Sequence, residues 1–194
     1  MVLTVTTNPL LEYRFEINTL RHNSTMRAVR EYNYAGGKGI NVSRQLNRFG
    51  LNNQALLFLG GLNGKKLRKS LEADNINYSV VNTHAETRSA SLFMSLDDGS
   101  VTTVIGKNFK PDLKEIEEFR HRLEKMMANC STVVFAGSSP SDEAGEIFTF
   151  GIELANKLDK VSVLDTYGSA LRECINKAPT ILHNNINELC NLVG

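Results

Sequence analysis

Continuous apolar runs and helix-like apolar patterns alternate along most of the chain. The continuous runs are bounded by Gly, Pro, Asn or Ser and predict buried strands over residues 2–5, 55–59, 78–81, 132–136, 161–164 and 180–182. Apolar residues recur at helical spacing over residues 40–49, 65–74, 113–127, 141–158 and 167–176, and a further helix begins at Asn185. Repeated strand–helix–strand units predict an α/β fold, with a mostly parallel sheet and helices on both faces.

A second group of segments alternates polar and apolar residues instead. Residues 12–17 alternate in this way, with residues 26–34 as the expected partner strand. Residues 89–95 and 101–105 are joined by Asp97-Asp98-Gly99, which is a strong hairpin signal. Alternation is typical of a strand with one solvated face. We therefore expect a small second sheet from about 12–34 and 89–105, within a single domain of residues 1–194.

The stretch 35–44 (AGGKGINVSR) places three glycines around Lys38, directly before a predicted helix. Glycine lets main-chain amides approach a ligand, and the free amides and dipole of a helix N-terminus favour oxygen-rich or anionic groups. The stretch lacks the spacing of a Walker A loop and of the G-x-G-x-x-G dinucleotide motif, so it does not itself indicate nucleotide binding. A tight strand-to-helix turn with an ordinary exposed lysine explains the same residues without a ligand.

Short polar turns follow most of the predicted main-sheet strands. They are Asn8, Gly60-Gly61, residues 137–139, Asp165 and residues 183–185. Each turn alone is explained as a turn or a helix cap. Together they belong to the carboxyl ends of parallel strands, which is the edge at which open α/β sheets bind ligands. The set therefore favours a ligand-binding edge.

Three features at the ends of predicted elements carry candidate chemistry. Arg88 opens a predicted strand, and its forked donors can clamp a phosphate. Ser138 lies in Gly137-Ser138-Ser139-Pro140, whose amides and hydroxyls suit a sugar or a phosphate. Asn185 and Glu188 share one helix face and can hold Mg²⁺ through water beside phosphates. The alternatives are an exposed arginine, a helix N-cap and a capping box, respectively.

Composition and charge argue against several function classes. The 22 Lys and Arg residues are balanced by 21 Asp and Glu residues. The net charge therefore gives no indication of binding to nucleic acid or to an acidic membrane. No apolar run is long enough to span a bilayer, and the amino terminus lacks the pattern of a signal peptide. The scattered Cys130, Cys174 and Cys190 have no metal-ligand spacing and predict buried thiols in a reducing cytoplasm.

Six motifs occur in an order that resembles a known family. They are Thr7-Asn8-Pro9, residues 35–44, Glu86-Thr87-Arg88, Gly137-Ser138-x-Pro140, residues 163–166 (VLDT) and Asn185-x-x-Glu188-Leu189. In this order they resemble the PfkB group of ribokinase-like carbohydrate kinases, and within it the 1-phosphofructokinase and tagatose-6-phosphate kinase branch. The resemblance implies a Rossmann-like α/β core with a small β-sheet lid, which closes over the sugar and often forms a homodimer contact.

The resemblance also implies an activity and a set of residue roles. A ketohexose phosphate, such as fructose 1-phosphate or tagatose 6-phosphate, would receive the γ-phosphoryl group of ATP with the aid of Mg²⁺. The residues implied in sugar-phosphate binding are Glu12, Gly36, Gly37, Lys38, Asn41, Arg88 and Ser138, with Lys38 and Arg88 serving the phosphate. Asn185 and Glu188 would organise Mg²⁺ and the triphosphate, Glu188 through water.

The sequence departs from the family pattern at several positions. Glu12 stands where the family usually has Asp, and His183-Asn184 where a Lys-Pro usually precedes the Asn-x-x-Glu motif. A catalytically inactive sugar-phosphate-binding or regulatory homologue is therefore the alternative. The family's Gly-x-Gly-Asp segment, which supplies an anion hole and the catalytic base, does not occur in residues 1–194. The resemblance thus implies a domain that is incomplete at its C-terminus, with the base downstream of this chain.

Overall fold

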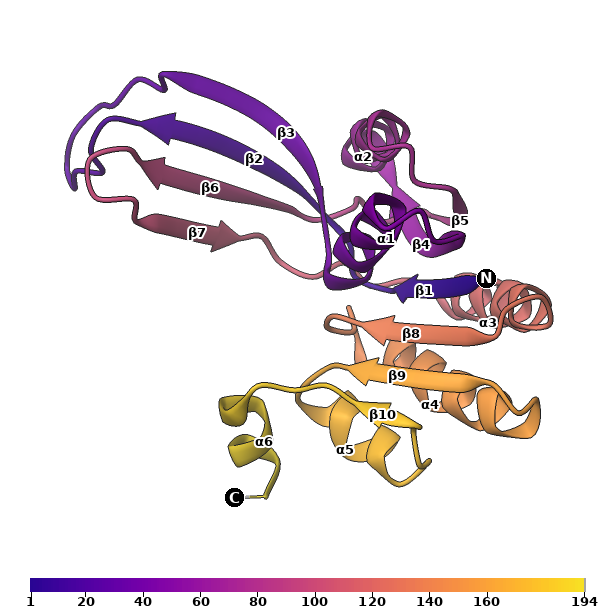
Figure 1. Cartoon of the computed structure of the whole chain (residues 1–194). Helices are drawn as coiled ribbons and strands as arrows, with labels where there is room; N and C mark the ends of the chain where they lie inside the picture. The colour runs from indigo at the N-terminus through magenta and orange to yellow at the C-terminus, as the bar shows by residue number, and fades with distance from the viewer. Residues whose placement is uncertain (194) are drawn as a thin grey trace.

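The main sheet has six strands in the order β10-β9-β8-β1-β4-β5 in the computed structural model, which describes residues 1–193 (Figure 1). Every neighbouring pair in this sheet is parallel. The strands are β1 (Val2–Thr6), β4 (Asn53–Gly60), β5 (Tyr78–Thr83), β8 (Thr132–Ala136), β9 (Val161–Asp165) and β10 (Ile181–Leu182). The predicted α/β fold with a mostly parallel sheet is therefore confirmed.

Helices cover both faces of the main sheet. They are α1 (Lys38–Arg48), α2 (Gly61–Ala73), α3 (Leu113–Met127), α4 (Asp142–Lys157) and α5 (Ser169–Ile175), and α6 (Ile186–Val193) follows the last strand. Leu56 and Phe58 of β4 pack in one core with residues of α3, α4 and α5, whereas Leu57 and Leu59 pack in another with residues of α1 and α2. Because successive strand residues face opposite sides, these two helix groups cover opposite faces of the sheet. No helix within residues 1–193 is long and apolar enough to cross a membrane.

A separate sheet of four strands, in the order β3-β2-β6-β7, extends away from the main sheet (Figure 1). Its strands are β2 (Leu10–Ile17), β3 (Arg30–Gly36), β6 (Ser89–Ser95) and β7 (Val101–Ile105). β2 is antiparallel to β3 and parallel to β6, and β6 is antiparallel to β7. Leu11 and Ala35 anchor this sheet in the core that includes α1 and α2, whereas every residue of β7 is exposed. The second sheet that the alternating segments predict is therefore present.

The bounds of β3 and α2 differ most from the sequence prediction. β3 spans Arg30–Gly36 rather than 26–34, because its ladder with β2 runs from Arg30 opposite Glu16 to Gly36 opposite Leu10. α2 begins at Gly61, before the predicted 65–74, and the Glu86 carboxylate accepts hydrogen bonds from two amides of its first turn, at 3.2 and 2.5 Å. An acidic group at a helix N-terminus is stabilising. This one comes from a residue far along the chain, so the local pattern could not show it.

The three cysteines differ in burial. Cys130 and Cys174 are buried, whereas Cys190 on α6 is exposed. Burial raises the pKa of the Cys130 thiol and raises the pKa of the Cys174 thiol to about 12. The prediction of buried thiols is therefore wrong for Cys190, because α6 lies beyond the ends of β9 and β10 and not over a face of the sheet (Figure 1).

Candidate functional site

The N-terminus of α1 lies at the carboxyl edge of the main sheet and depends on glycine. Gly37 caps the helix with φ of +136° and offers no side-chain hydrogen bond to the first turn. A Cβ at Gly37 would lie 2.9 Å from Cγ2 of Thr6, and one at Gly39 would lie 2.3 Å from Oγ1 of Thr6. Only glycine therefore lets α1 start this close to the end of β1. The first turn is left with amides that no capping side chain of the described residues covers.

Lys38, the first residue of α1, makes two ion pairs at this edge. Its Nζ lies 2.6 Å from Oδ1 of Asp165 at the end of β9 and 3.3 Å from Oε1 of Glu188 on α6. Burial disfavours the charged form of Lys38, but hydrogen bonds and charge from the two carboxylates outweigh burial and raise its pKa. The ammonium is thus held by two anions of the chain itself, and its expected contact with a sugar phosphate stays a prediction.

The Asn185-x-x-Glu188 motif forms the capping box that its spacing allows. The Glu188 amide donates to Oδ1 of Asn185 at 2.9 Å, and the Asn185 amide donates to Oε2 of Glu188 at 3.1 Å. The side chain of Asn184 donates to the same Oε2 at 3.1 Å. Partial burial opposes ionisation of Glu188, but these hydrogen bonds and Lys38 lower its pKa. The motif therefore caps a helix and also presents an ionised carboxylate at the edge.

The donor set around Lys38 fits a magnesium ion. Asp165 and Glu188 provide carboxylate oxygens, and Asn185 provides an amide oxygen close to Glu188. Magnesium prefers such oxygen ligands and keeps several waters. The ammonium of Lys38 between the two carboxylates shows that a positive charge is accommodated at this point. Asn185 and Glu188, with Asp165 beside them, are therefore the side chains that would hold the ion.

Arg88 lies in a second polar group, where the small sheet meets the main sheet. Its Nη2 donates to the carbonyl oxygen of Asn8 and its Nη1 donates to Oδ1 of Asn108, both at 3.0 Å. The Asn8 side chain donates to Oδ1 of Asn108 and to Oγ of Ser138, also at 3.0 Å. These contacts bring Arg88 and Ser138, which lie far apart in the sequence, to one place. The sequence predicted both residues but not Asn108.

Two buried polar atoms in the Arg88 group have no hydrogen-bond partner among the described residues. They are Nε of Arg88 and Oδ1 of Asn8. Burial also lowers the pKa of Arg88, with the phenol of Tyr167 acting in the opposite direction. A buried donor without a partner is costly unless water or a ligand satisfies it. The group is therefore suited to receive a small polar or anionic ligand.

The remaining predicted residues lie on the small sheet and α1, and arginines bind two of them. Glu12 accepts from Arg14 at 2.8 and 2.5 Å, and Asn41 accepts from Arg44 at 2.6 Å. A Cβ on Gly36 would lie 2.4 Å from Oε1 of Glu12, so this carboxylate lies directly over the glycine turn. Arg14 was not predicted, although it lies two residues from Glu12 and therefore on the same face of β2.

Tyr167 and two hydrogen bonds connect these groups. The ring centroid of Tyr167 lies 5.8 Å from Nζ of Lys38, and the same phenol affects the pKa of Arg88. The Gly137 amide donates to the carbonyl of Asp165 at 2.9 Å, and Thr166 Oγ1 donates to the carbonyl of Gly137 at 2.8 Å. The loops after β8 and β9 are therefore joined. These loops and the α1 start are part of the predicted edge, and ligand binding there stays a prediction.

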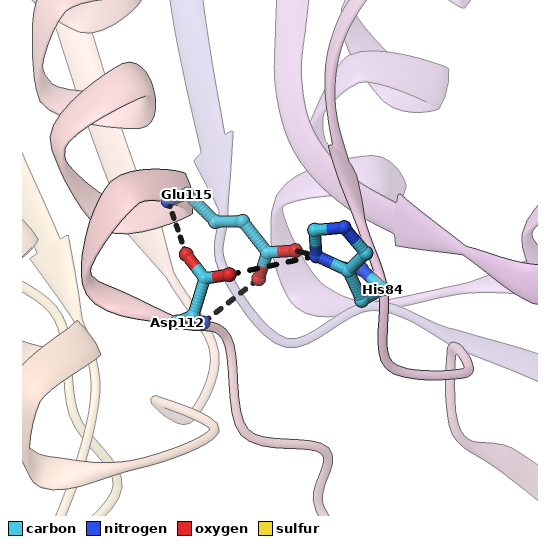
Figure 2. A group of neighbouring side chains, drawn as sticks. All are labelled: His84, Asp112 and Glu115. Carbon is cyan, nitrogen blue, oxygen red and sulfur yellow. Dashed lines mark hydrogen bonds and ion pairs between the residues drawn. The ribbon is translucent and has the colours of Figure 1, made fainter.

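His84, Asp112 and Glu115 form another group of potential metal ligands (Figure 2). Nδ1 of His84 lies 2.8 Å from Oε1 of Glu115 and 3.5 Å from Oδ2 of Asp112. Asp112 and Glu115 form a capping box at the start of α3, and the backbone amide of His84 donates to Glu115 at 2.7 Å. These hydrogen bonds cap α3 and fix it to the loop after β5. They account for all three side chains without a ligand.

The sequence matches a known protein family and two of its named members. The pattern of the pfkB family carbohydrate kinases matches residues 9–194. The tagatose-6-phosphate kinase of Staphylococcus epidermidis is 31% identical over 196 aligned residues, which cover 100% of this chain and 63% of the relative. The 1-phosphofructokinase of Borreliella burgdorferi is 33% identical over 192 residues, which cover 97% of this chain and 60% of the relative. The chain thus spans less than two thirds of the length of these relatives.

A solved structure shares the fold. Phosphofructokinase-2 from Escherichia coli, in complex with fructose-6-phosphate, superposes with a TM-score of 0.87 at 23% identity. The superposition covers 99% of this chain and 63% of that chain. At this identity the likeness concerns the fold, with its parallel sheet and its separate small sheet. Because the family pattern extends over residues 9–194, the chain belongs to the pfkB family of carbohydrate kinases.

Proposed function

We propose that this protein is an ATP-dependent kinase of a ketohexose phosphate, acting as a 1-phosphofructokinase that converts fructose 1-phosphate to fructose 1,6-bisphosphate. The main supporting observation is that half-buried Arg88, whose buried Nε has no partner among the described residues, shares one sheet edge with Asp165 and Glu188, which pair with the same lysine. The first group suits a phosphate, and the second suits a metal beside a nucleotide. Family membership and the two named kinase relatives support the same reading.

The sugar phosphate would bind between α1 and the small sheet. Arg88 and Lys38 would pair with its phosphate, while the amides around Gly36 and Gly37 would face its oxygens. Asn41 and Glu12 would accept hydrogen bonds from sugar hydroxyls once their arginine partners adjust, and Ser138 would lie beside the sugar. Closure of the small sheet as a lid would exclude water from this space.

ATP and Mg²⁺ are the proposed cosubstrate and cofactor. Asn185 and Glu188 would hold the metal through water, with Asp165 nearby, next to the triphosphate. The metal supplies neutralisation of the phosphate charge, which is a main requirement of phosphoryl transfer. Such a reaction takes place where ATP is available, and we propose the cytoplasm.

Tagatose 6-phosphate is the second candidate substrate, because the relative that covers all of this chain is a tagatose-6-phosphate kinase. A sugar-phosphate-binding protein without catalysis is a candidate of another class. The pairing of Glu12 with Arg14 favours it, since that carboxylate is not free for a sugar hydroxyl. The absence of a Gly-x-Gly-Asp segment from residues 1–194 leads us to expect binding without turnover from these residues alone. Loss of a general base alone costs about 10²–10⁴-fold in rate.

Calorimetry and an ADP-release assay together test the proposal. Fructose 1-phosphate, tagatose 6-phosphate and a non-hydrolysable ATP analogue are titrated into the 194-residue chain, and ADP release is then measured for this chain and for the complete gene product. We expect binding of one sugar phosphate and of the nucleotide, and turnover by the complete product. Sugar-phosphate binding without nucleotide binding or turnover in either form would favour the regulatory alternative. No binding of any of the three would contradict both.

A further inference from the structure

Lys38 bridges two carboxylates, and each of them also has another polar partner. Oδ2 of Asp165 lies 3.3 Å from the ring of His183, and Oε2 of Glu188 accepts from the Asn184 side chain at 3.1 Å. The other oxygen of each carboxylate faces the same Lys38 ammonium, at 2.6 and 3.3 Å. Lys38 thus occupies the position between two anions at which a free cation would also be stabilised.

The ammonium of Lys38 is carried on a flexible arm from the glycine turn. Lys38 follows Gly37 directly, and its side chain is 41% exposed. A lysine stem rotates easily and its ammonium binds as a point charge, so it can exchange one anion for another without movement of the helix. Its backbone belongs to the turn whose free amides suit a sugar phosphate. A Cβ at Gly137, the residue before Ser138, would lie 3.9 Å from Cβ of Lys38, so the Lys38 stem runs between the two carboxylates and the proposed sugar site.

We propose that Lys38 serves two parts of the site in turn, an inference that rests on the function proposed above. One part is the carboxylate pair Asp165 and Glu188, and the other is the sugar-phosphate site beside Arg88. Without a divalent cation, Lys38 neutralises Asp165 and Glu188. Once Mg²⁺ has neutralised these carboxylates, Lys38 turns to the phosphate of the bound sugar. Mg²⁺ and sugar phosphate then strengthen each other's binding by the same factor, because coupling between binding sites is reciprocal.

The charges of Asp165 and Glu188 explain why Mg²⁺ should strengthen sugar-phosphate binding. The side chains of Asp165 and Glu188 are only 21% and 16% exposed. A sugar phosphate that drew Lys38 away would leave these two anions facing each other without a cation, which is costly for partly buried groups. Bound Mg²⁺ removes that cost. Coupling between two binding sites typically changes affinity by about 5–150-fold, and we expect Mg²⁺ to raise the affinity for sugar phosphate roughly tenfold.

The test is a calorimetric titration of fructose 1-phosphate and tagatose 6-phosphate, without nucleotide, in Mg²⁺ and in EDTA. It compares the wild type with Lys38→Met and with Lys114→Met, which removes an exposed lysine of α3. The wild type and Lys114→Met are expected to bind the sugar phosphate roughly tenfold more tightly in Mg²⁺. Lys38→Met should bind it weakly and within about twofold in both buffers, because no shared cation remains. Lys38→Gln replaces Lys38→Met if the latter fails to fold.

A second titration, of Mg²⁺ alone, tests the competition directly. Removing the ammonium should make Mg²⁺ bind more tightly to Lys38→Met than to the wild type. Equal sugar-phosphate affinity of the wild type in both buffers, coupling that survives in Lys38→Met, or weaker Mg²⁺ binding by that variant would each overturn the inference alone. If neither the wild type nor Lys114→Met binds a sugar phosphate in either buffer, the proposed function fails as well.

Discussion

Gly37 is the residue at which the geometry of the α1 turn is most easily tested. Its φ is +136° and an added Cβ would lie 2.9 Å from Thr6, whereas Gly50 has φ of +68° with nothing within 4 Å of the added atom. Gly37→Ala should therefore lower the free energy of unfolding by about 2–4 kcal/mol, from backbone strain and overpacking together. Gly50→Ala is the matched control and should cost only about 1 kcal/mol. Urea unfolding of both variants measures the difference, and equal losses would show that the close approach of α1 to β1 is absent.

The three thiols should react at very different rates. Burial raises the pKa of the Cys174 thiol to about 12 and also raises that of Cys130, while Cys190 is exposed. Only a thiolate reacts quickly with a disulfide reagent, so at about pH 8 we expect one fast equivalent in Ellman's assay of the native protein. Cys190→Ser should remove that equivalent, whereas Cys130→Ser should not. Two or more fast equivalents in the native protein would contradict the burial of the other two thiols.

Polar residues were easier to predict from the sequence than their partners. Arg88, Ser138, Asn185 and Glu188 stood out by residue type and by position at the ends of predicted strands or at a helix start, and all of them lie at the carboxyl edge. The pairing of Lys38 with Asp165 joins residues 127 positions apart, so it depends on the strand order and on the start of α1. No local pattern encodes that pairing.

Glu86 explains why α2 starts at Gly61. Its carboxylate accepts hydrogen bonds from the amides of Leu62 and Asn63, and neither Gly60 nor Gly61 has a side chain that could do so. Glu86→Ala should lower the free energy of unfolding by about 1 kcal/mol, the usual value of a helix cap. Glu117→Ala, on the exposed side of α3, is the control and should change stability by less than about 0.5 kcal/mol. A Glu86→Ala loss no larger than that of the control would mean that the cap contributes nothing.

The strands of the main sheet were predicted well because burial on both faces leaves continuous apolar runs, such as residues 55–59 in β4. The small sheet was predicted by its alternation, but the bounds of β3 were not. Residues Arg30 to Asn33 of β3 are exposed, so their hydrophobic pattern does not mark the strand. The hydrogen-bonded register with β2 sets its bounds instead.

The exposed edge of the small sheet indicates that two copies of the chain associate through it. Val101, Val104 and Ile105 of its edge strand β7 are 55%, 60% and 57% exposed, and exposed apolar edge strands tend to pair. We expect a homodimer through this sheet. Val104→Glu should shift light scattering toward the monomer mass, because it buries a charge in the proposed contact. Leu113→Glu, at an apolar residue of α3 that is 75% exposed, should not. A monomeric wild type would contradict the proposed dimer.

The affinity of a sugar phosphate for the wild type and for Arg88→Ala tests the proposed function most directly. Calorimetry with fructose 1-phosphate or tagatose 6-phosphate should give saturable binding to the wild type, weakened in Arg88→Ala by about 1.5–3 kcal/mol, the usual value of a hydrogen bond to a charged group. Arg48→Ala, at the exposed end of α1, is the control and should bind like the wild type. Unphosphorylated fructose should bind the wild type and Arg88→Ala equally weakly. Equal sugar-phosphate affinity of the wild type and Arg88→Ala would contradict a phosphate site at the carboxyl edge.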